Sequence, residues 1–128
     1  QVTERNLQSN QVLTKLQRMP DATTAKIAAL NDHARQTFGE CRVVITQGVA
    51  ELGKDDVAYI LDKVRKYKDF TPINDPYFEH DFGSIQFGEN TIFWKIDYYD
   101  IDLQMHSPDP SDPAVTTRIL TIMLAEEY

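Results

Sequence analysis

The sequence is poor in the residues that staple secreted proteins and in the apolar runs that cross membranes. Its 128 residues include a single cysteine, Cys41, so no internal disulfide can form and no second thiolate is present for a cysteine-based zinc site. No apolar run approaches the roughly 20 residues that span a bilayer. The first ten residues, QVTERNLQSN, contain no signal-peptide core. These absences predict an intracellular, cytoplasmic protein without a membrane partner.

Basic residues are also few. The chain has 13 Lys and Arg against 20 Asp and Glu, and its formal net charge is −7. Direct nucleic-acid binding uses clustered Lys and Arg to meet the phosphates, so we do not expect it. The densest basic cluster, at 63–68, is flanked by acids on a predicted helix, and a solvated helix face explains it better than a binding patch.

The length and a hydrophobic content of 41% predict one folded domain over residues 1–128. A thin apolar stripe in residues 3–18 permits a helix there, so residues 1–20 can form a helical arm that Pro20 ends. The composition leaves the cofactors and the oligomeric state open, and a homodimer that uses this arm is compatible with the sequence.

A helix with a polar cluster is predicted between Asp21 and Gly39. Asp21, or one of the two threonines that follow it, can cap the first turn. The apolar residues recur at helical spacing: Ile27, Leu30, Ala34 and Phe38. Asn31, Asp32 and Arg35 lie within one turn, and Asp32 with Arg35 can pair at i, i+3. A surface ion pair is a simpler interpretation of these residues than a functional site.

The next segments predict a short strand and a second helix. Residues 42–46, RVVIT, are mostly β-branched and favour a strand. A helix then begins at Asp55 or Asp56 and continues through Phe70. Its buried stripe consists of Val57, Ile60, Leu61, Val64 and Tyr67.

Most of the unusual residues lie in one stretch, Asn74–Asp112. It holds the one Trp and nine acidic residues against a single basic residue, so its local charge is −8. It predicts a hairpin of strands at 83–87 and 91–98 around a turn at 88–90. An even-numbered turn places these residues on a core face: Ile85, Phe87, Ile92, Trp94, Ile96 and Tyr98. The polar face then carries His80, Phe82, Ser84, Phe93, Lys95, Asp97 and Tyr99, and an odd-numbered turn would change this assignment.

The rest of the chain predicts a third strand and a last helix. The strand at 101–106 would turn Ile101, Leu103 and Met105 inward. Asp112 would then cap a helix that runs through Ala125 and, being apolar almost all round, lies centrally in the core. The predicted fold class is α+β: a small antiparallel sheet of three to four strands packed against two to four helices, which form a single layer on one face.

Several blocks of the sequence resemble a known family. The blocks are Leu-Asn-Asp-x-x-Arg at 30–35, Thr-x-Gly-Val at 46–49, Asn-Asp-Pro-x-x-Glu-His-Asp-Phe-Gly at 74–83, Lys-Ile-Asp-Tyr-Tyr-Asp at 95–100, Ser-Pro-Asp-Pro-x-Asp-Pro-x-Val-Thr-x-Arg at 107–118 and Leu-Thr-Ile-Met-Leu-Ala at 120–125. Together they resemble the bacterial and phage domain of unknown function numbered 3768, from about residue 25 to residue 128. The resemblance implies no established reaction. It implies cargo of plasmids and phages, and hence a role in defence, counter-defence or mobile-element upkeep.

One hypothesis for the function is a metal-dependent hydrolase that cleaves phosphoesters. The mixed nitrogen and oxygen ligands that Zn, Mn or Fe takes would come from His80, Asp97, His106 and either Asp81 or Asp102. The catalytic residues would be His80, Lys95 and Asp97, with Lys95 neutralising developing negative charge. The spacing matches no established metal motif. In the alternative, structural interpretation, Lys95 and Asp97 form ion pairs and His80 holds a loop carbonyl.

A second hypothesis, which we favour, is a binding or regulatory module that docks its acidic surface on a basic groove of another protein. The candidate binding residues are Asn74, Asp75, Glu79, Asp81, Tyr99, Asp100, Asp109 and Arg118. Asn74 and Asp75 can close an Asx-turn. Arg118 requires an acidic partner if it is buried, because an unpaired buried charge is very costly.

Overall fold

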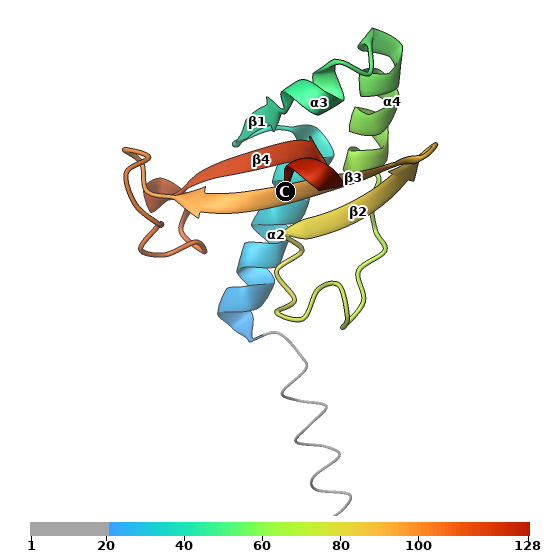
Figure 1. Cartoon of the computed structure of the whole chain (residues 1–128). Helices are drawn as coiled ribbons and strands as arrows, with labels where there is room; N and C mark the ends of the chain where they lie inside the picture. Colours follow the sequence, from blue (N-terminus) through green and yellow to red (C-terminus); the bar gives the residue numbers. More distant parts are fainter. Residues whose placement is uncertain (1–20) are drawn as a thin grey trace, which may run out of the picture.

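A computed structural model describes residues 21–128, and the helical arm predicted for residues 1–20 lies outside this range. The elements follow one another as α2 (Ala22–Thr37), β1 (Arg42–Ile45), α3 (Gln47–Ala50), α4 (Lys54–Arg65), β2 (Phe82–Phe87), β3 (Asn90–Tyr99), the 3-10 turn η1 (Pro113–Val115), β4 (Thr117–Leu124) and the 3-10 turn η2 (Ala125–Glu127) (Figure 1). No helix of the described part is long and apolar enough to cross a membrane.

The four strands form one mixed sheet in the order β1-β4-β3-β2. β2 with β3 and β3 with β4 are antiparallel, whereas β1 runs parallel to β4 with Arg42 opposite Ile119. The α+β class is therefore confirmed, and the prediction of a purely antiparallel sheet is corrected at one pair. The parallel pair arises because the chain leaves β1 through α3 and α4 before it builds the hairpin.

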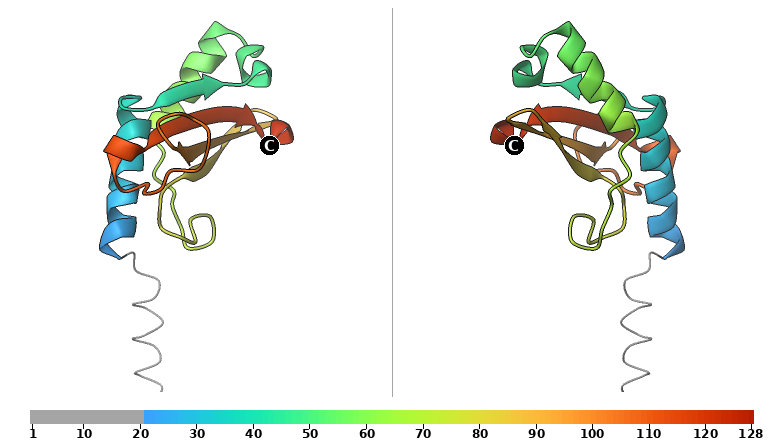
Figure 2. Two further views of the ribbon diagram at one scale, coloured as in Figure 1. Left: turned by 90° about the vertical axis from the view of Figure 1, so that its left-hand side faces the viewer. Right: turned by 90° about the vertical axis from the view of Figure 1, so that its right-hand side faces the viewer.

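The helices cover a single face of the sheet, as predicted. Alternation turns Ile92, Trp94, Leu120 and Ile122 to that face, and all four are fully buried. They form one core with residues from three helices: Ile27, Val49, Ile60 and Val64. The two views of Figure 2 place the C-terminal turn on the side away from α2. Apart from this short 3-10 turn, no helix of the described residues lies over the other face.

The helices predicted to begin near Asp21 and Asp55 do begin there, and the second ends early. The carboxylate of Asp21 accepts a hydrogen bond from the N–H of Thr24 at 2.7 Å and so caps the start of α2. At the other end, Phe38 adopts the left-handed conformation that terminates the helix. α4 ends at Arg65 rather than at Phe70. Tyr67 and Phe70 nevertheless pack edge-on against Trp94, so the apolar positions were assigned correctly beyond the helix itself.

The central hairpin has the predicted faces. Its turn contains two residues, with Gly88 at φ +58°, and pairs Phe87 with Asn90. This even number places Trp94 on the core face opposite Gly83. A Cβ atom on Gly83 would lie 2.3 Å from Nε1 of Trp94, so only glycine lets the indole lie this close to β2.

The predicted third strand is wrong. Residues 100–106 form a turn that contributes one bridge, between Tyr99 and His106. The carboxylate of Asp100 accepts a hydrogen bond from the N–H of Gln104 and closes the turn. Met105, which alternation would turn inward, is 71% exposed. The hydrogen bond from the backbone to the side chain of Asp100, rather than the apolar alternation, therefore determines the structure of this segment.

The predicted last helix is also wrong. Asp112 does cap a turn, because its carboxylate accepts a hydrogen bond from the N–H of Ala114 at 2.9 Å, but the turn is the short η1. The chain then enters β4, a central strand whose alternate residues Arg118, Leu120 and Ile122 are buried. A nearly continuous apolar run suits a buried helix and a central strand equally, and the β-branched residues of β4 favour the strand.

Candidate functional site

The loop between α4 and β2 is held in two consecutive turns; we call residues 69–81 the anchored loop. The N–H of Asp75 bonds the carbonyl of Thr71 at 2.8 Å, and the N–H of Phe78 bonds the carbonyl of Asp75 at 3.2 Å. The side-chain amide of Asn74 links the first turn to its start, since it accepts from the N–H of Thr71 and donates to the carbonyl of Asp69. Asn74 thus closes the turn predicted for it.

Asp75 and His80 fix this loop to the body of the protein. Asp75 is only 4% exposed and accepts a hydrogen bond from the N–H of His80. The imidazole stacks on the ring of Phe70 at 4.0 Å, with Nδ1 3.0 Å from the carboxylate of Asp32 and Nε2 3.6 Å from that of Asp75. His80 therefore connects the loop to α2.

The position of His80 corrects the predicted polar face. Strand alternation begins only at Phe82, and His80 has a φ of +55°, which lies outside strand geometry. The side chain consequently contacts Phe70 and Asp32 instead of lying beside Lys95 and Asp97. The predicted catalytic trio is separated in this way: Lys95 and Asp97 stay together, and His80 belongs to a different cluster.

Behind the loop, four polar side chains form a directed chain of hydrogen bonds, which we call the buried relay. Nε of Arg118 donates to Oδ1 of Asn31 at 2.8 Å, and Nδ2 of Asn31 donates to the hydroxyl of Tyr98 at 2.7 Å. That hydroxyl donates to the carboxylate of Glu79 at 2.7 Å. The relay runs from a cation to an anion, an arrangement in which each bond polarises the next.

The buried relay supplies a hydrogen-bond partner for the guanidinium of Arg118. Arg118 is buried, and its guanidinium also donates to the carbonyl of Pro110 and lies 5.3 Å from the ring centre of Tyr98. Burial lowers the pKa of Arg118, whereas Tyr98 and Glu79 oppose that shift. Burial and the bond to Glu79 raise the pKa of Tyr98, so the hydroxyl stays protonated and remains a donor. The acidic partner predicted for Arg118 is therefore reached through Asn31 and Tyr98 rather than directly.

Arg35 is buried, whereas the sequence predicted a surface ion pair between Asp32 and Arg35. The bond to Asp32 exists at 3.2 Å, but the side chain of Arg35 is 1% exposed. Its guanidinium donates hydrogen bonds to the carbonyls of Val64 and Arg65, the last two residues of α4, at 3.0 and 2.9 Å. Cations are favoured at helix C-termini because the unpaired carbonyls carry partial negative charge. Arg35 therefore joins α2 to α4.

The acidic residues of the central stretch mostly bond within the chain. The carboxylate of Asp109 accepts from the N–H and hydroxyl of Ser111, and these bonds lower its pKa. Asp100 and Asp112 close turns in the same way. Asp97 accepts from Lys95 at 2.9 Å, which raises the pKa of Lys95. Much of the negative charge thus shapes loops rather than forming a plain acidic surface.

Asp81 differs from the other acids. Burial, and then the carboxylate of Glu79, raise its pKa to about 6. It lies at a recess of about 310 Å³ that is also lined by Asp97, Tyr99 and His106. The carboxylates of Asp81 and Asp97 therefore line the same recess.

The predicted metal ligands are not brought together. Within residues 21–128 no group of three or more His, Cys, Asp or Glu side chains is arranged to hold a metal ion. His80 faces Asp32, Asp97 bonds Lys95, and Nδ1 of His106 bonds the carbonyl of Ser107. Among the described residues, His80, Asp97 and His106 therefore do not form one common ligand set.

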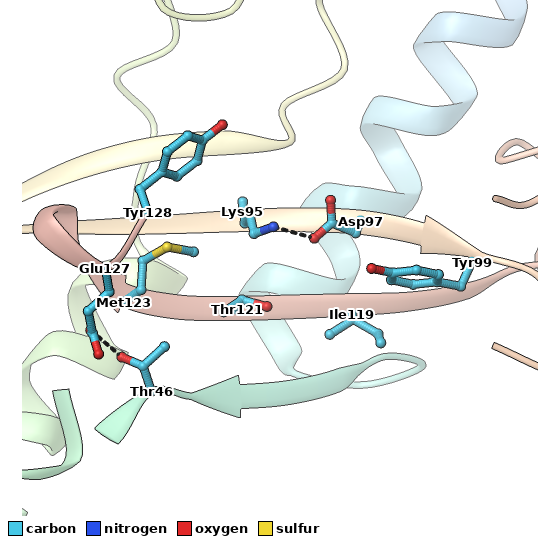
Figure 3. A pocket seen from close by; sticks show the side chains of 9 residues that line it. All are labelled: Thr46, Lys95, Asp97, Tyr99, Ile119, Thr121, Met123, Glu127 and Tyr128. Carbon is cyan, nitrogen blue, oxygen red and sulfur yellow. Dashed lines mark hydrogen bonds and ion pairs between the residues drawn. The ribbon is translucent and has the colours of Figure 1, made fainter. Parts of the chain in front are cut away.

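A larger recess lies on the uncovered face of the sheet, between β3, β4 and η2 (Figure 3). Its volume is about 450 Å³, and it is lined by Thr46, Lys95, Asp97, Tyr99, Ile119, Thr121, Met123, Glu127 and Tyr128. We call it the sheet recess. Lys95, Asp97 and Tyr99 were singled out by sequence, but Thr121 and Glu127 were not. Thr121 was missed because residues 117–124 were predicted as part of a helix, whereas in β4 Thr121 lies opposite Lys95.

The fold and these sites define a small α+β protein with a mixed four-stranded sheet, one helix-covered face and one open face. The chain belongs to the family described as "Protein of unknown function (DUF3768)", whose model matches residues 45–127. The resemblance noted from the sequence blocks is thereby confirmed. Comparison with curated proteins and with solved structures gives no significant match.

Proposed function

We propose that this protein is a binding module that presents the anchored loop to a cleft on a partner protein. The observation that carries the proposal is the display of two large apolar side chains on this loop: Ile73 is 92% exposed and Tyr77 is 78% exposed. Buried aromatic and aliphatic anchors supply most of the affinity in protein interfaces. A loop that displays such anchors is suited to insertion into a complementary cleft.

The loop geometry supports this role. Ile73 follows Pro72 in the turn that begins at Thr71, and Tyr77 follows Pro76 in the turn that begins at Asp75. Each apolar side chain therefore stands near the tip of a turn whose backbone proline restricts. Because the loop is already ordered, little conformational entropy remains to be lost on binding, and more of the contact energy appears as affinity.

Charge defines the partner. The anchored loop contains four acids, Asp69, Asp75, Glu79 and Asp81, and no Lys or Arg. An apolar cleft with a basic rim would accept Ile73 and Tyr77 while its cations meet the acids around them. An anionic lipid surface would be repelled by the same charge, which favours a protein partner over a membrane.

The partner surface proposed here differs from the acidic-surface hypothesis in the role of the candidate residues. Asn74, Asp75 and Glu79 hold the loop through internal hydrogen bonds. Contact would instead be made by Ile73 and Tyr77, which charge-based reasoning passed over. The acids would then steer association and select the partner more than they add affinity.

Site-specific photo-crosslinking tests the proposal. A photoreactive benzoylphenylalanine replaces Tyr77 in one variant and the similarly exposed Met105 in another, and both are irradiated in cells of the source organism. We expect a discrete adduct from position 77 that position 105 does not give. The adduct partner, once purified, should bind Ile73→Ser at least about tenfold more weakly than the unaltered protein.

The salt dependence and a control complete this test. Binding to the purified partner should weaken as ionic strength rises from about 0.05 to 0.5 M, since screening acts on the basic rim. Ile101→Ser, which also removes an exposed apolar side chain, should leave affinity unchanged. Equal adducts from positions 77 and 105, or full affinity of Ile73→Ser, would contradict the proposal.

A further inference from the structure

The sheet recess contains the Lys95–Asp97 ion pair on β3 and the β4 residues that lie opposite it. Lys95 lies opposite Thr121, and Asp97 lies opposite Ile119, in the antiparallel register of β3 and β4. Figure 3 shows Lys95 and Asp97 pointing toward one another, with Tyr128 at one end of the recess and Tyr99 at the other. A recess of about 450 Å³ falls in the size range of small-molecule sites, roughly 300–1,000 Å³.

The charges open to a ligand in this recess are one cation and one anion. The Nζ of Lys95 and the carboxylate of Asp97 are 2.9 Å apart, and the two side chains are 36% and 38% exposed. Glu127 also lines the recess, but its two oxygens already accept bonds from the hydroxyl of Thr46 and the N–H groups of Gly48 and Leu124. Glu127 therefore closes the wall and offers little to a ligand.

Hydroxyl groups and apolar side chains complete the lining. Tyr99, Thr121 and Tyr128 line the recess, and none of their hydroxyls hydrogen-bonds another of the described residues. Ile119 and Met123 add apolar surface from β4. A few polar groups on a partly apolar wall fix the orientation of a ligand while the wall holds its apolar part.

We propose that the sheet recess binds a zwitterionic small molecule of amino-acid size, with its carboxylate on Lys95 and its ammonium group on Asp97. A ligand of single charge would be attracted by one of these side chains and repelled by the other. A zwitterion satisfies both and replaces one bond between them by two charge-assisted bonds. The apolar side chain of the ligand would lie on Ile119 and Met123, and the free hydroxyls would bond its carboxylate and ammonium edges.

This inference is independent of the proposed function, because the recess lies on the uncovered face and the anchored loop is held to α2 and the covered face. Loss of one activity therefore leaves the other measurable. Lys95→Met and Asp97→Asn, which remove the two charges, do not touch Ile73 or Tyr77.

Calorimetric titration of the full chain with each standard L-amino acid tests the proposal. We expect binding of at least one with an apolar side chain. For that amino acid, the N-acetyl derivative lacks the cation and the amide derivative lacks the anion, and each should bind at least about tenfold more weakly. Lys95→Met and Asp97→Asn should produce similar losses. Lys63→Met, which removes an exposed lysine outside the recess, should not.

Thermal melts of each variant separate a lost site from a lost fold. The surface pair contributes little to stability, so both variants should melt close to the unaltered protein. The absence of heat with every amino acid at millimolar concentration would overturn the proposal. So would equal affinity for an amino acid and its N-acetyl derivative, since the ammonium group would then have no role.

Discussion

On the covered face of the sheet, Arg118, Asn31, Tyr98 and Glu79 bond one another in a single direction, and every member is partly or fully buried. On the uncovered face of the same strands, Lys95 and Asp97 bond each other, and the hydroxyls of Tyr99, Thr121 and Tyr128 bond no other residue of the described part of the chain. Tyr98 and Arg118 lie on β3 and β4, the strands that also carry Lys95, Asp97 and Thr121, so membership of a strand does not explain the difference. Burial does: a polar group removed from water must find its partner inside the protein.

The largest expected effect breaks the buried relay. Asn31→Leu leaves Nε of Arg118 and the hydroxyl of Tyr98 without their shared partner. Since one of the stranded groups is a buried cation, the free energy of unfolding should fall by about 3 kcal/mol or more. Urea denaturation measures this change. Thr121→Val on the uncovered face is the control, with an expected change within about 0.5 kcal/mol. Equal effects of the two substitutions would remove the contrast between the faces.

A second effect comes from the close approach of the hairpin to Trp94. Gly83→Ala places a Cβ atom 2.3 Å from Nε1 of the indole, which is fully buried. Overpacking of this kind should lower the free energy of unfolding by about 1–3 kcal/mol. Ser84→Ala changes the neighbouring residue, which is exposed, and should alter it by less than about 0.5 kcal/mol. Thermal or urea melts of the pair would contradict us if Ser84→Ala were the more harmful.

The raised pKa of Asp81 predicts a pH-dependent effect at the boundary of the two faces. Its pKa is about 6 in the folded chain against an ordinary value of 3.8. The folded protein thus holds this proton more tightly, so Asp81 makes stability fall as pH rises from about 4 to about 6. Below that window both states are protonated and the residue has no effect.

Asp81→Asn should therefore stabilise the protein at neutral pH and not at acidic pH. Because the side chain is partly exposed, we discount the full shift and expect a gain of about 1 kcal/mol at pH 7 and none at pH 3.5. Melting curves across this range measure the difference. Asp97→Asn, on the uncovered face, is the matched control and should show no such gain. A constant offset at all pH values would show that burial of Asp81 is not the cause.

The smallest effect concerns the Lys95–Asp97 pair. Both side chains are about one-third exposed, so a double-mutant cycle with Lys95→Met and Asp97→Asn should give a coupling energy of less than about 1 kcal/mol. The coupling should decline further in high salt. A coupling energy larger than that between Asn31 and Arg118 would contradict our prediction that polar interactions on the covered face stabilise the protein more than those on the uncovered face.

Sequence reasoning succeeded where a local pattern had one structural solution. The even-numbered turn and the alternation around Trp94 led to the correct hairpin faces, and the spacing from Ile27 to Ala34 led to α2. It failed at residues 117–124, where an apolar run fits a buried helix and a central strand equally well. It failed again at residues 100–106, where the side chain of Asp100 closes a turn in place of a strand.

The candidate residues followed the same division. Lys95 and Asp97, two apart on one strand, were correctly placed together because a strand repeats every two residues. His80 was placed with them wrongly, because its left-handed φ cannot be read from a polar alternation. Arg35 and Asn31 were recognised as a cluster, but their burial depends on α4 and β4, which are distant in sequence.

The sequence alone determined the acidic character of the chain, the hairpin, the capped helix α2 and the family to which the chain belongs, since each depends on neighbouring residues or on the order of residues. The tertiary structure alone decided which face of the sheet the helices cover. That choice buried Arg35, Arg118 and Asn31 and left Lys95 and Asp97 in contact with water. A polar side chain becomes a member of a hydrogen-bonded interior or part of an open recess according to which long-range contacts exclude water from it.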